Sequence, residues 1–237
     1  REWIKFAIKS FTQNGYDVLY SDTDSVYLID RTNWNTEQRL FDIKERIIQT
    51  IKAGVPFPKD SFDMGLECKI KAIFFFKDAD DKEKKKNYIY VRDDDKLVIK
   101  GLQVIKRNCT EVSKRVFEIL EPQIIKNLDV KFDKKYLQGL LEKELKNDIS
   151  LAAVTFKVGN IYKNESSIQA QIYAKYGMGV HKFIRNKRFG IGTSTKLCQL
   201  KDADKLTFSD LDLDVVWSEL KPFIKEVKEK KLGEWFK

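Results

Sequence analysis

Histidine and cysteine are scarce in this chain of 237 residues, which contains one His and three Cys. Cys68, Cys109 and Cys198 are odd in number and far apart, which fits neither a disulfide framework nor a zinc site with closely spaced ligands. We expect them to be buried thiols in a reducing compartment. His181 has no second metal ligand at helical spacing, so we expect no catalytic histidine.

Long apolar runs are also absent. No stretch approaches the roughly 18 apolar residues that a membrane-spanning helix needs. The amino terminus lacks the basic-then-apolar order of a signal peptide. The sequence therefore predicts a soluble, intracellular protein with no membrane partner.

Charged residues, by contrast, are abundant. The chain carries 45 Lys and Arg against 36 Asp and Glu, which gives a formal net charge of +9. This excess favours a polyanionic partner. A lysine-rich surface that serves solubility or heat resistance gives the same balance, so the motifs must decide between the two.

Hydrophobic periodicity predicts an α+β fold, in which a small sheet with helices is followed by a mostly helical lobe. Two β-prone runs, 17–20 and 26–29, flank a polar stretch and predict a tight hairpin with an acidic tip. Strands are also predicted at 66–76 and 88–91, with the charged run 77–86 between them as a turn or solvated loop. The predicted helices lie at 1–14 and 36–51 and after Asn108, Asp133, Ser166 and Asp214. Asn108 and Glu111 have the spacing of a capping box. Pro222 is expected to kink the last helix.

Asp22 and Asp24 are the candidate metal ligands, because two acids at a hairpin tip can direct their carboxylates toward one point. Mg²⁺ is usually held by one or two carboxylates, with substrate phosphates at other positions. In phosphoryl transfer such ions neutralise charge and align the attacking and leaving oxygens. Asp, Ser and Thr also favour turns for local reasons, so the spacing alone leaves a plain turn and a metal site equally open.

The stretch Val18–Ser25 closely resembles the signature of the family B DNA polymerases, in which Tyr, a small residue, Asp-Thr-Asp and Ser form a hairpin of the palm domain. A helix similar to that over 1–11 precedes this hairpin in the family. Further matches follow in order, and the resemblance runs continuously to about residue 120. These matches are Leu66-Glu67, Lys86-Asn87-Tyr88, Lys100-Gly101 and Lys106-Arg107-Asn108.

The resemblance implies three parts: the carboxyl-terminal part of a palm over 1–80, a DNA-binding thumb over 81–228 and a tail over 229–237. The family's Lys-any-Tyr motif holds the primer-template, which implies DNA contacts by Lys86 and Tyr88. The basic turn and the downstream basic pair of the family imply further DNA contacts. The residues at these positions are Lys100, Gly101, Lys106 and Arg107.

A family B polymerase adds deoxynucleoside triphosphates to a primer 3′ end by a two-metal mechanism, so the resemblance implies two Mg²⁺ ions, with Mn²⁺ as an alternative. Asp24 is expected to be the principal metal ligand and Asp22 a supporting one, while Tyr20 and Ser25 shape the turn. In many members an acid stands at the position of Lys69, so a metal role for Glu67 is left open.

The second palm acid, the fingers helix and the proofreading exonuclease lie before the matched region in the family. We therefore expect a large polymerase polypeptide as a partner, beside primer-template DNA and deoxynucleoside triphosphates. Such an enzyme would be cytoplasmic and associated with the nucleoid.

Two other functions compete with this interpretation. A glycosyltransferase also uses an Asp-any-Asp motif for a divalent ion and a nucleotide diphosphate, but it needs a βαβ arrangement before the acids, where this chain has only a helix. A non-catalytic DNA-binding subunit of polymerase ancestry is the second alternative. The intact pair Asp22 and Asp24 argues against such decay.

A basic segment in the predicted thumb has two interpretations. Its cations are interleaved with Phe183 and Phe189, and they either follow a phosphate backbone or form an ordinary basic surface hairpin. They are Lys182, Arg185, Lys187 and Arg188.

The last residues resemble the short peptide by which archaeal and eukaryotic replication proteins bind the ring-shaped sliding clamp. Leu232, Trp235 and Phe236 have its spacing and would fill a hydrophobic pocket of the clamp. Glu229 replaces the usual leading Gln, which predicts a weaker contact. Alternatively, Trp235 and Phe236 fold back onto the thumb.

Overall fold

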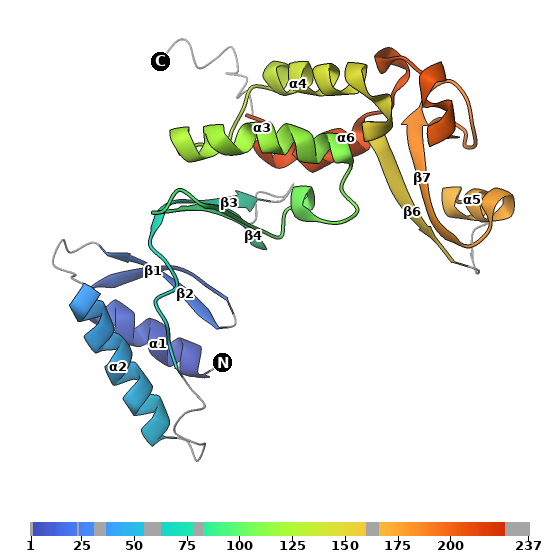
Figure 1. Ribbon diagram of the computed structural model, residues 1–237. Helices are drawn as coiled ribbons and strands as arrows, with labels where there is room; N and C mark the ends of the chain where they lie inside the picture. The colour runs from blue at the N-terminus through green and yellow to red at the C-terminus, as the bar shows by residue number, and fades with distance from the viewer. Residues whose placement is uncertain are drawn as a thin grey trace, which may run out of the picture. The chain divides into compact units, whose positions relative to one another are not determined.

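A computed structural model describes residues 2–22, 24–30, 37–54, 63–77, 83–159 and 166–225. The chain divides into two compact units, Arg1–Cys68 and Lys69–Lys237, and each is described by itself (Figure 1). Both units combine helices with small antiparallel sheets, which confirms the predicted α+β fold.

In the first unit, two amphipathic helices pack against one hairpin. α1 (Glu2–Gln13) ends where Gly15 turns the chain at a φ of 86°, and α2 (Glu37–Ala53) follows the hairpin. β1 (Tyr16–Asp22) and β2 (Ser25–Asp30) pair antiparallel. One small apolar core joins the helices to one face of the hairpin. It contains Ala7, Phe11, Tyr16, Ile43, Ile47 and Ile51, with Leu28, Leu40 and Met64 packed against it.

The second unit begins with a three-stranded sheet in the order β3-β4-β5, built from Ile70–Lys77, Glu83–Arg92 and Leu97–Lys100. Its apolar residues share a large core with α3 (Glu111–Asn127), α4 (Lys134–Asn147) and α6 (Asp214–Leu220). Because β3 pairs with β4, β3 belongs by packing to the second unit, whereas the sequence placed it before the domain boundary at residue 80.

A second three-stranded sheet lies in the part of the chain predicted to be mostly helical. β6 (Ala153–Val158), β7 (Gly179–Asn186) and β8 (Lys196–Gln199) pair antiparallel in that order, and α5 (Ile168–Tyr176) connects β6 to β7. Val158, Ile172, Phe183 and Leu197 form a small core between helix and sheet (Figure 1). Short 3₁₀-helices complete the unit: η2 (Gln103–Ile105), η3 (Ile149–Ala152), η4 (Leu200–Lys205), η5 (Phe208–Asp210) and η6 (Lys221–Phe223).

Several helix starts and ends differ from the sequence prediction. Asp133 caps α4 as predicted, accepting hydrogen bonds from the Lys135 and Tyr136 amides at 2.7 and 3.3 Å. The predicted capping box of Asn108 is wrong, because the residue that precedes α3 is Thr110. Ser167, not Ser166, caps α5, and Pro222 lies beyond the end of α6 rather than kinking it.

Two predicted strand boundaries are also wrong. β3 begins at Ile70, so Leu66-Glu67 lies before this strand, in a segment without regular secondary structure. β4 begins at Glu83, so the end of the charged run is strand rather than loop. No helix in the described ranges is both long and apolar enough to cross a membrane. Cys109 and Cys198 are buried free thiols, as expected, and Cys68 is half-buried.

Candidate functional site

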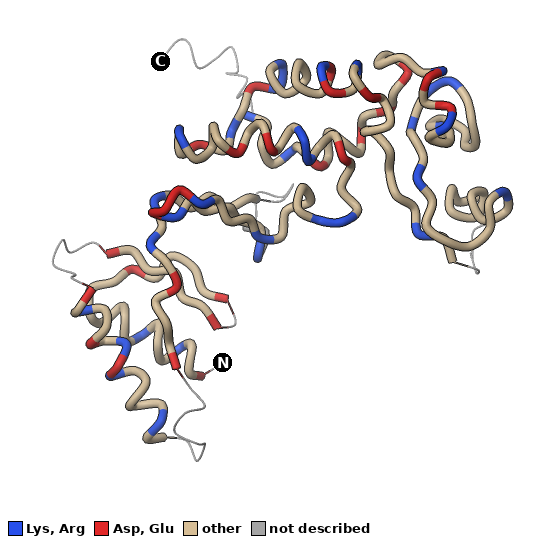
Figure 2. The backbone as a smooth tube through the Cα atoms, in the orientation of Figure 1, with Lys and Arg blue, Asp and Glu red and all other residues tan. Residues whose placement is uncertain are grey.

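The acidic hairpin is the first candidate site, and its loop is as tight as the sequence predicts. Asp22 pairs with Ser25 at the end of the ladder, so only residues 23 and 24 connect the strands. Residue 23 lies outside the described residues. Asp22 is half-buried and Asp24 is exposed, and Figure 2 shows acidic segments on both sides of the short grey gap at the tip.

A β-bulge in β1 decides which face carries Asp22. Val18 pairs with Leu28, but Tyr20 pairs with Tyr27, so Leu19 is an extra residue without a cross-strand partner. Side chains alternate between the faces of a strand, and one extra residue shifts this alternation. Before the bulge, Val18 shares the face of Leu28, which packs on the helices. After it, Asp22 lies on the opposite face.

An aromatic pair lies beside Asp22 on this face. Tyr20 and Tyr27 are cross-strand partners with ring centroids 5.6 Å apart, and the Asp22–Ser25 pair follows two residues further along the ladder. Tyr20 was expected to shape the turn, and that role stays a prediction. Tyr27 could not be found from the sequence, because its proximity follows from the register that the bulge sets.

The donor set of the hairpin fits a hard cation in part. Carboxylates are the oxygen ligands that Mg²⁺ prefers, and a site of one or two carboxylates completed by substrate phosphates is common. In the described part of the chain, no cluster of three or more His, Cys, Asp or Glu side chains has the geometry of a metal site. A metal site formed by Asp22 and Asp24 stays a prediction.

The second candidate site is the basic motif at the bend of β4. Phe75 pairs with Tyr88 and Lys77 with Glu83, so four residues of β4, 84–87, face one residue of β3. Lys86 lies in this bulge at a φ of 67°, a left-handed conformation that lysine rarely adopts. Its side chain is exposed.

Gly101 explains how this bend is packed. Tyr88 pairs with Lys100, so the chain leaving β5 passes directly beside Lys86 and Asn87. A Cβ on Gly101 would lie 2.1 Å from the Lys86 carbonyl oxygen and 2.3 Å from the Asn87 side-chain oxygen. The φ of Gly101 is 73°. Only glycine allows this approach without displacing the backbone.

Tyr88 is placed differently from the exposed lysines. Its side chain is 4% exposed, and its ring packs at 5.8 Å from Phe75 and at 6.3 Å from Tyr90. The tyrosine therefore supports the sheet that carries Lys86 and Lys100. A direct contact between Tyr88 and DNA stays a prediction.

Lys106 and Arg107 extend the exposed basic residues of this unit. Both side chains are exposed in the segment that joins η2 to α3. The structure thus places Lys86, Lys100 and Gly101 side by side, and Lys106 and Arg107 shortly after them in the same unit. Asp22 and Asp24 belong to the other compact unit.

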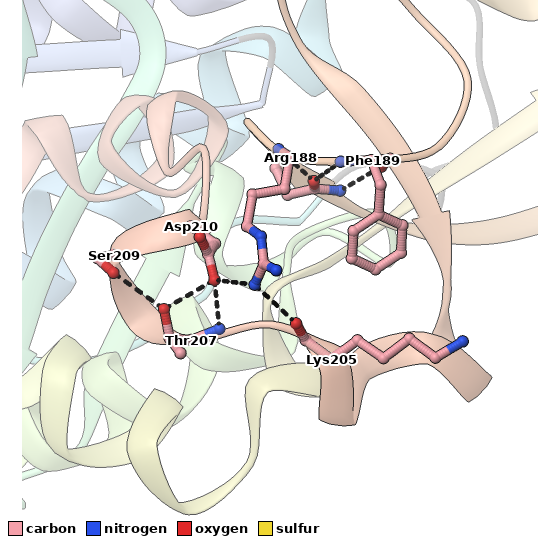
Figure 3. Close-up of polar contacts among 7 residues, drawn as sticks. Arg188, Phe189, Lys205, Thr207, Ser209 and Asp210 are labelled. Atoms are coloured by element: carbon pink, nitrogen blue, oxygen red, sulfur yellow. Dashed lines mark hydrogen bonds and ion pairs between the residues drawn. The ribbon is translucent and has the colours of Figure 1, made fainter.

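The basic segment of β7 is partly neutralised by nearby acids. The Arg188 guanidinium donates to the Asp210 carboxylate at 3.1 Å and to the Lys205 carbonyl at 3.0 Å (Figure 3). Arg185 lies 3.4 Å from the Asp212 carboxylate. Both arginines thus have partners within the fold, which favours the interpretation as an ordinary surface hairpin for these two. Lys182 and Lys187 are exposed.

The two acids also accept hydrogen bonds. The backbone and hydroxyl of Thr207 donate to Asp210 and, with Arg188, hold the pKa of that carboxyl below its ordinary value. Burial raises the pKa of Asp212, but hydrogen bonds from Thr195 and the Asp214 amide, together with the Arg185 charge, outweigh it and lower that pKa.

The predicted clamp-binding residues Leu232, Trp235 and Phe236 lie outside the described residues. The contact therefore stays a prediction.

Comparison of the sequence with known proteins finds several relatives. DNA polymerase 1 of Saccharolobus solfataricus is 32% identical over 162 residues, which are 65% of this chain and 16% of that protein. The DNA polymerase of Bombyx mori nuclear polyhedrosis virus is 28% identical over 136 residues, which are 56% of this chain and 13% of that protein. This chain is similar to part of a DNA polymerase.

The chain is also similar to part of DNA polymerase 1 of Sulfurisphaera ohwakuensis, which is 32% identical over 133 residues. The chain spans only 13% of that protein and at most 16% of the Saccharolobus and viral polymerases. No protein-family model matches the chain.

Proposed function

We propose that this chain is the carboxyl-terminal catalytic part of a family B DNA-directed DNA polymerase, with part of the palm at its start and the thumb after it. It would add deoxynucleotides to a primer 3′ end. We further propose that it acts only together with an upstream part that carries the remaining palm, the fingers and the exonuclease. The chain spans at most 16% of the length of these polymerases.

One observation carries the proposal: the acidic hairpin presents its carboxylates away from the core of its unit. The bulge at Leu19 turns Asp22 to the face opposite the helices, and Asp24 is exposed in the two-residue loop. Bulges recur next to active sites, where they re-aim a side chain. Similarity to DNA polymerases supplies the chemistry in which such carboxylates are needed.

In this proposal Asp24 is the principal metal ligand and Asp22 the supporting one. Bound Mg²⁺ would neutralise the phosphate charge and align the attacking and leaving oxygens. The protein's own contribution is position, because the antiparallel ladder and the α1–α2 core fix the tip on which both acids lie. Tyr20 and Tyr27 form a cross-strand ring pair on the same face as Asp22.

The basic residues of the second unit would hold the primer-template. Exposed Lys86, Lys100, Lys106 and Arg107 can each neutralise a phosphate, and such contacts position a duplex without reading its sequence. Gly101 keeps the Lys86 bend in place. Tyr88 would orient the primer from within the sheet.

The alternative is a non-catalytic DNA-binding subunit of polymerase ancestry. It would use the same basic residues and would not need the acids. Intact Asp22 and Asp24 at an accessible tip favour the catalytic proposal over this alternative.

Reconstitution tests the proposal. The full chain is mixed with the polypeptide that carries the upstream polymerase parts, and primer extension is measured for each component and for the mixture. We expect synthesis only from the mixture, and synthesis at least about 10²-fold slower when the chain carries Asp24→Asn. Equal synthesis with Asp24→Asn, in a complex shown to contain the chain, would support the non-catalytic subunit.

A further inference from the structure

A buried carboxylate from a residue far along the sequence lies at the start of α3. Glu219 of α6 is 3% exposed, and its oxygens accept the Thr110 backbone amide at 3.1 and 3.3 Å. The hydroxyl of Ser113 donates to the same carboxylate at 2.7 Å, and the hydroxyl of Thr110 also donates to it. Thr110 and Ser113 are themselves 1% and 0% exposed.

This carboxylate replaces a local cap. The Thr110 side chain makes no capping bond to its own helix, so the buried amide at the start of α3 depends on Glu219. A negative charge at a helix amino terminus is also favoured by the helix dipole. Burial, followed by the neighbouring Glu219 carboxylate, raises the pKa of the Cys109 thiol to about 12, so the thiol beside the cap stays neutral.

The capped amide is the end of the segment that carries Lys106 and Arg107. Leu102 and Val104 anchor the beginning of this segment in the core at 2% and 4% exposure. Between the anchors, the Cys109 amide donates to the Lys106 carbonyl at 3.1 Å. The two cations therefore lie on a short exposed turn whose far end is held by a residue 112 positions after Arg107.

We propose that Glu219 is a positioning residue for DNA binding, which fixes the turn that presents Lys106 and Arg107 to the phosphate backbone. This inference rests on the proposed DNA-binding role of these two cations. A fixed turn holds its charges in place before DNA arrives, so less order has to be gained on binding. A flexible turn would keep the same charge and bind more weakly.

The first test measures amide hydrogen exchange in the full chain without DNA. Glu219→Gln keeps the size of the side chain but removes its charge, and it should accelerate exchange of the Lys106, Cys109 and Thr110 amides by about tenfold or more. Asp133→Ala is the matched control, because it removes the carboxylate that caps α4 and should leave these amides unchanged. Unchanged exchange in Glu219→Gln overturns the inference.

The second test is a double-mutant cycle on duplex DNA binding, at a temperature where every variant is folded by circular dichroism. Glu219→Gln should raise Kd by about threefold or more in the parent chain and have no effect in the Lys106→Ala/Arg107→Ala background. Equal effects in both backgrounds overturn the inference. If Lys106→Ala/Arg107→Ala alone leaves Kd and its salt dependence unchanged, the proposed DNA-binding role of these two cations fails. The positioning role of Glu219 then fails with it. This holds even if the exchange experiment shows that Glu219 holds the turn.

Discussion

Gly101 and Lys86 approach so closely that a Cβ on Gly101 would lie 2.1 Å from the Lys86 carbonyl oxygen. Both residues also have a positive φ, of 73° and 67°. The lysine of the predicted primer-template motif and the glycine of the predicted basic turn, 15 positions apart in the sequence, thus form one packed unit. A change at Gly101 should therefore displace Lys86 as well.

Gly101→Ala should therefore reduce stability and displace Lys86. The added methyl group meets backbone that cannot rotate away, and the left-handed φ is unfavourable for alanine, so we expect a loss of about 1–3 kcal/mol in the free energy of unfolding. Urea denaturation measures it. The control is Gly139→Ala in α4, where an added Cβ would meet no atom within 4 Å apart from its chain neighbours and the backbone of its own helix, and it should stabilise the chain by about 0.5–1 kcal/mol. A stabilising Gly101→Ala contradicts the close approach.

Asp24→Asn should abolish most synthesis by the reconstituted polymerase, because the exposed tip acid is the proposed principal metal ligand. We expect kcat to fall by about 10²-fold or more with little change in duplex affinity. Asp22→Asn should cost less. Single-turnover nucleotide addition and a separate duplex-binding assay measure the two quantities. Small, equal effects of both substitutions would favour a plain turn.

Lys86→Ala and Lys106→Ala should weaken duplex binding regardless of sequence. Each should lower the slope of log K against log salt by about 0.9 if it neutralises one phosphate. Titrations between low and moderate salt measure this slope. Tyr88→Phe, which keeps the buried ring, is the suitable test of a polar contact by the tyrosine. Unchanged slopes for both lysines would assign them to an ordinary solvated surface.

Acid should destabilise the second unit through Asp212. The folded-state pKa of this carboxyl lies below its ordinary value of 3.8, so its contribution is present above that value and is lost as the pH falls through the lower folded pKa. Asp212→Asn should therefore lower Tm at pH 7, and this deficit should shrink below about pH 4. Calorimetry from pH 7 to 3 measures it, with the exposed Asp204→Asn as control. If the Tm deficit of Asp212→Asn stays constant with pH, the folded-state pKa of Asp212 is not lowered.

The carboxyl-terminal tail should bind the cognate sliding clamp through Leu232, Trp235 and Phe236. Replacing Trp235 and Phe236 with Ala should abolish clamp binding and clamp-stimulated processivity while single-nucleotide addition persists. Surface plasmon resonance and processivity assays measure both. If the wild type shows no binding at micromolar concentrations and the double variant loses thermal stability, the aromatics fold back onto the thumb instead.

Local patterns predicted the local features well. The apolar periodicity of α1, α2 and α4 and the alternation around residues 22–24 depend on neighbours in sequence, and these elements form as expected. The bulge at Leu19 was not predictable, because pairing between β1 and β2 sets it. Nor was the cap of α3, since its acceptor Glu219 lies 109 positions after Thr110.

The β6-β7-β8 sheet was missed for a related reason. β8 is only four residues long, and its partner is decided by packing around Phe183 and Leu197 rather than by its own pattern. The burial of the candidate site residues was not readable from the motifs, and their roles stay predictions. Tyr88 resembles an exposed primer contact in sequence and is a buried ring in the structure.

The extra residue in β1 changes how the faces of the strand must be counted. The strand runs from Tyr16, which packs in the core, to Asp22, which lies on the opposite face, although both positions are even-numbered. Removing Leu19 would leave a regular ladder in which Asp22 still pairs with Ser25 on the face opposite the core. Relatives that lack this one residue should therefore keep the acid on the same face, so a one-residue gap at Leu19 in an alignment does not move the acidic tip.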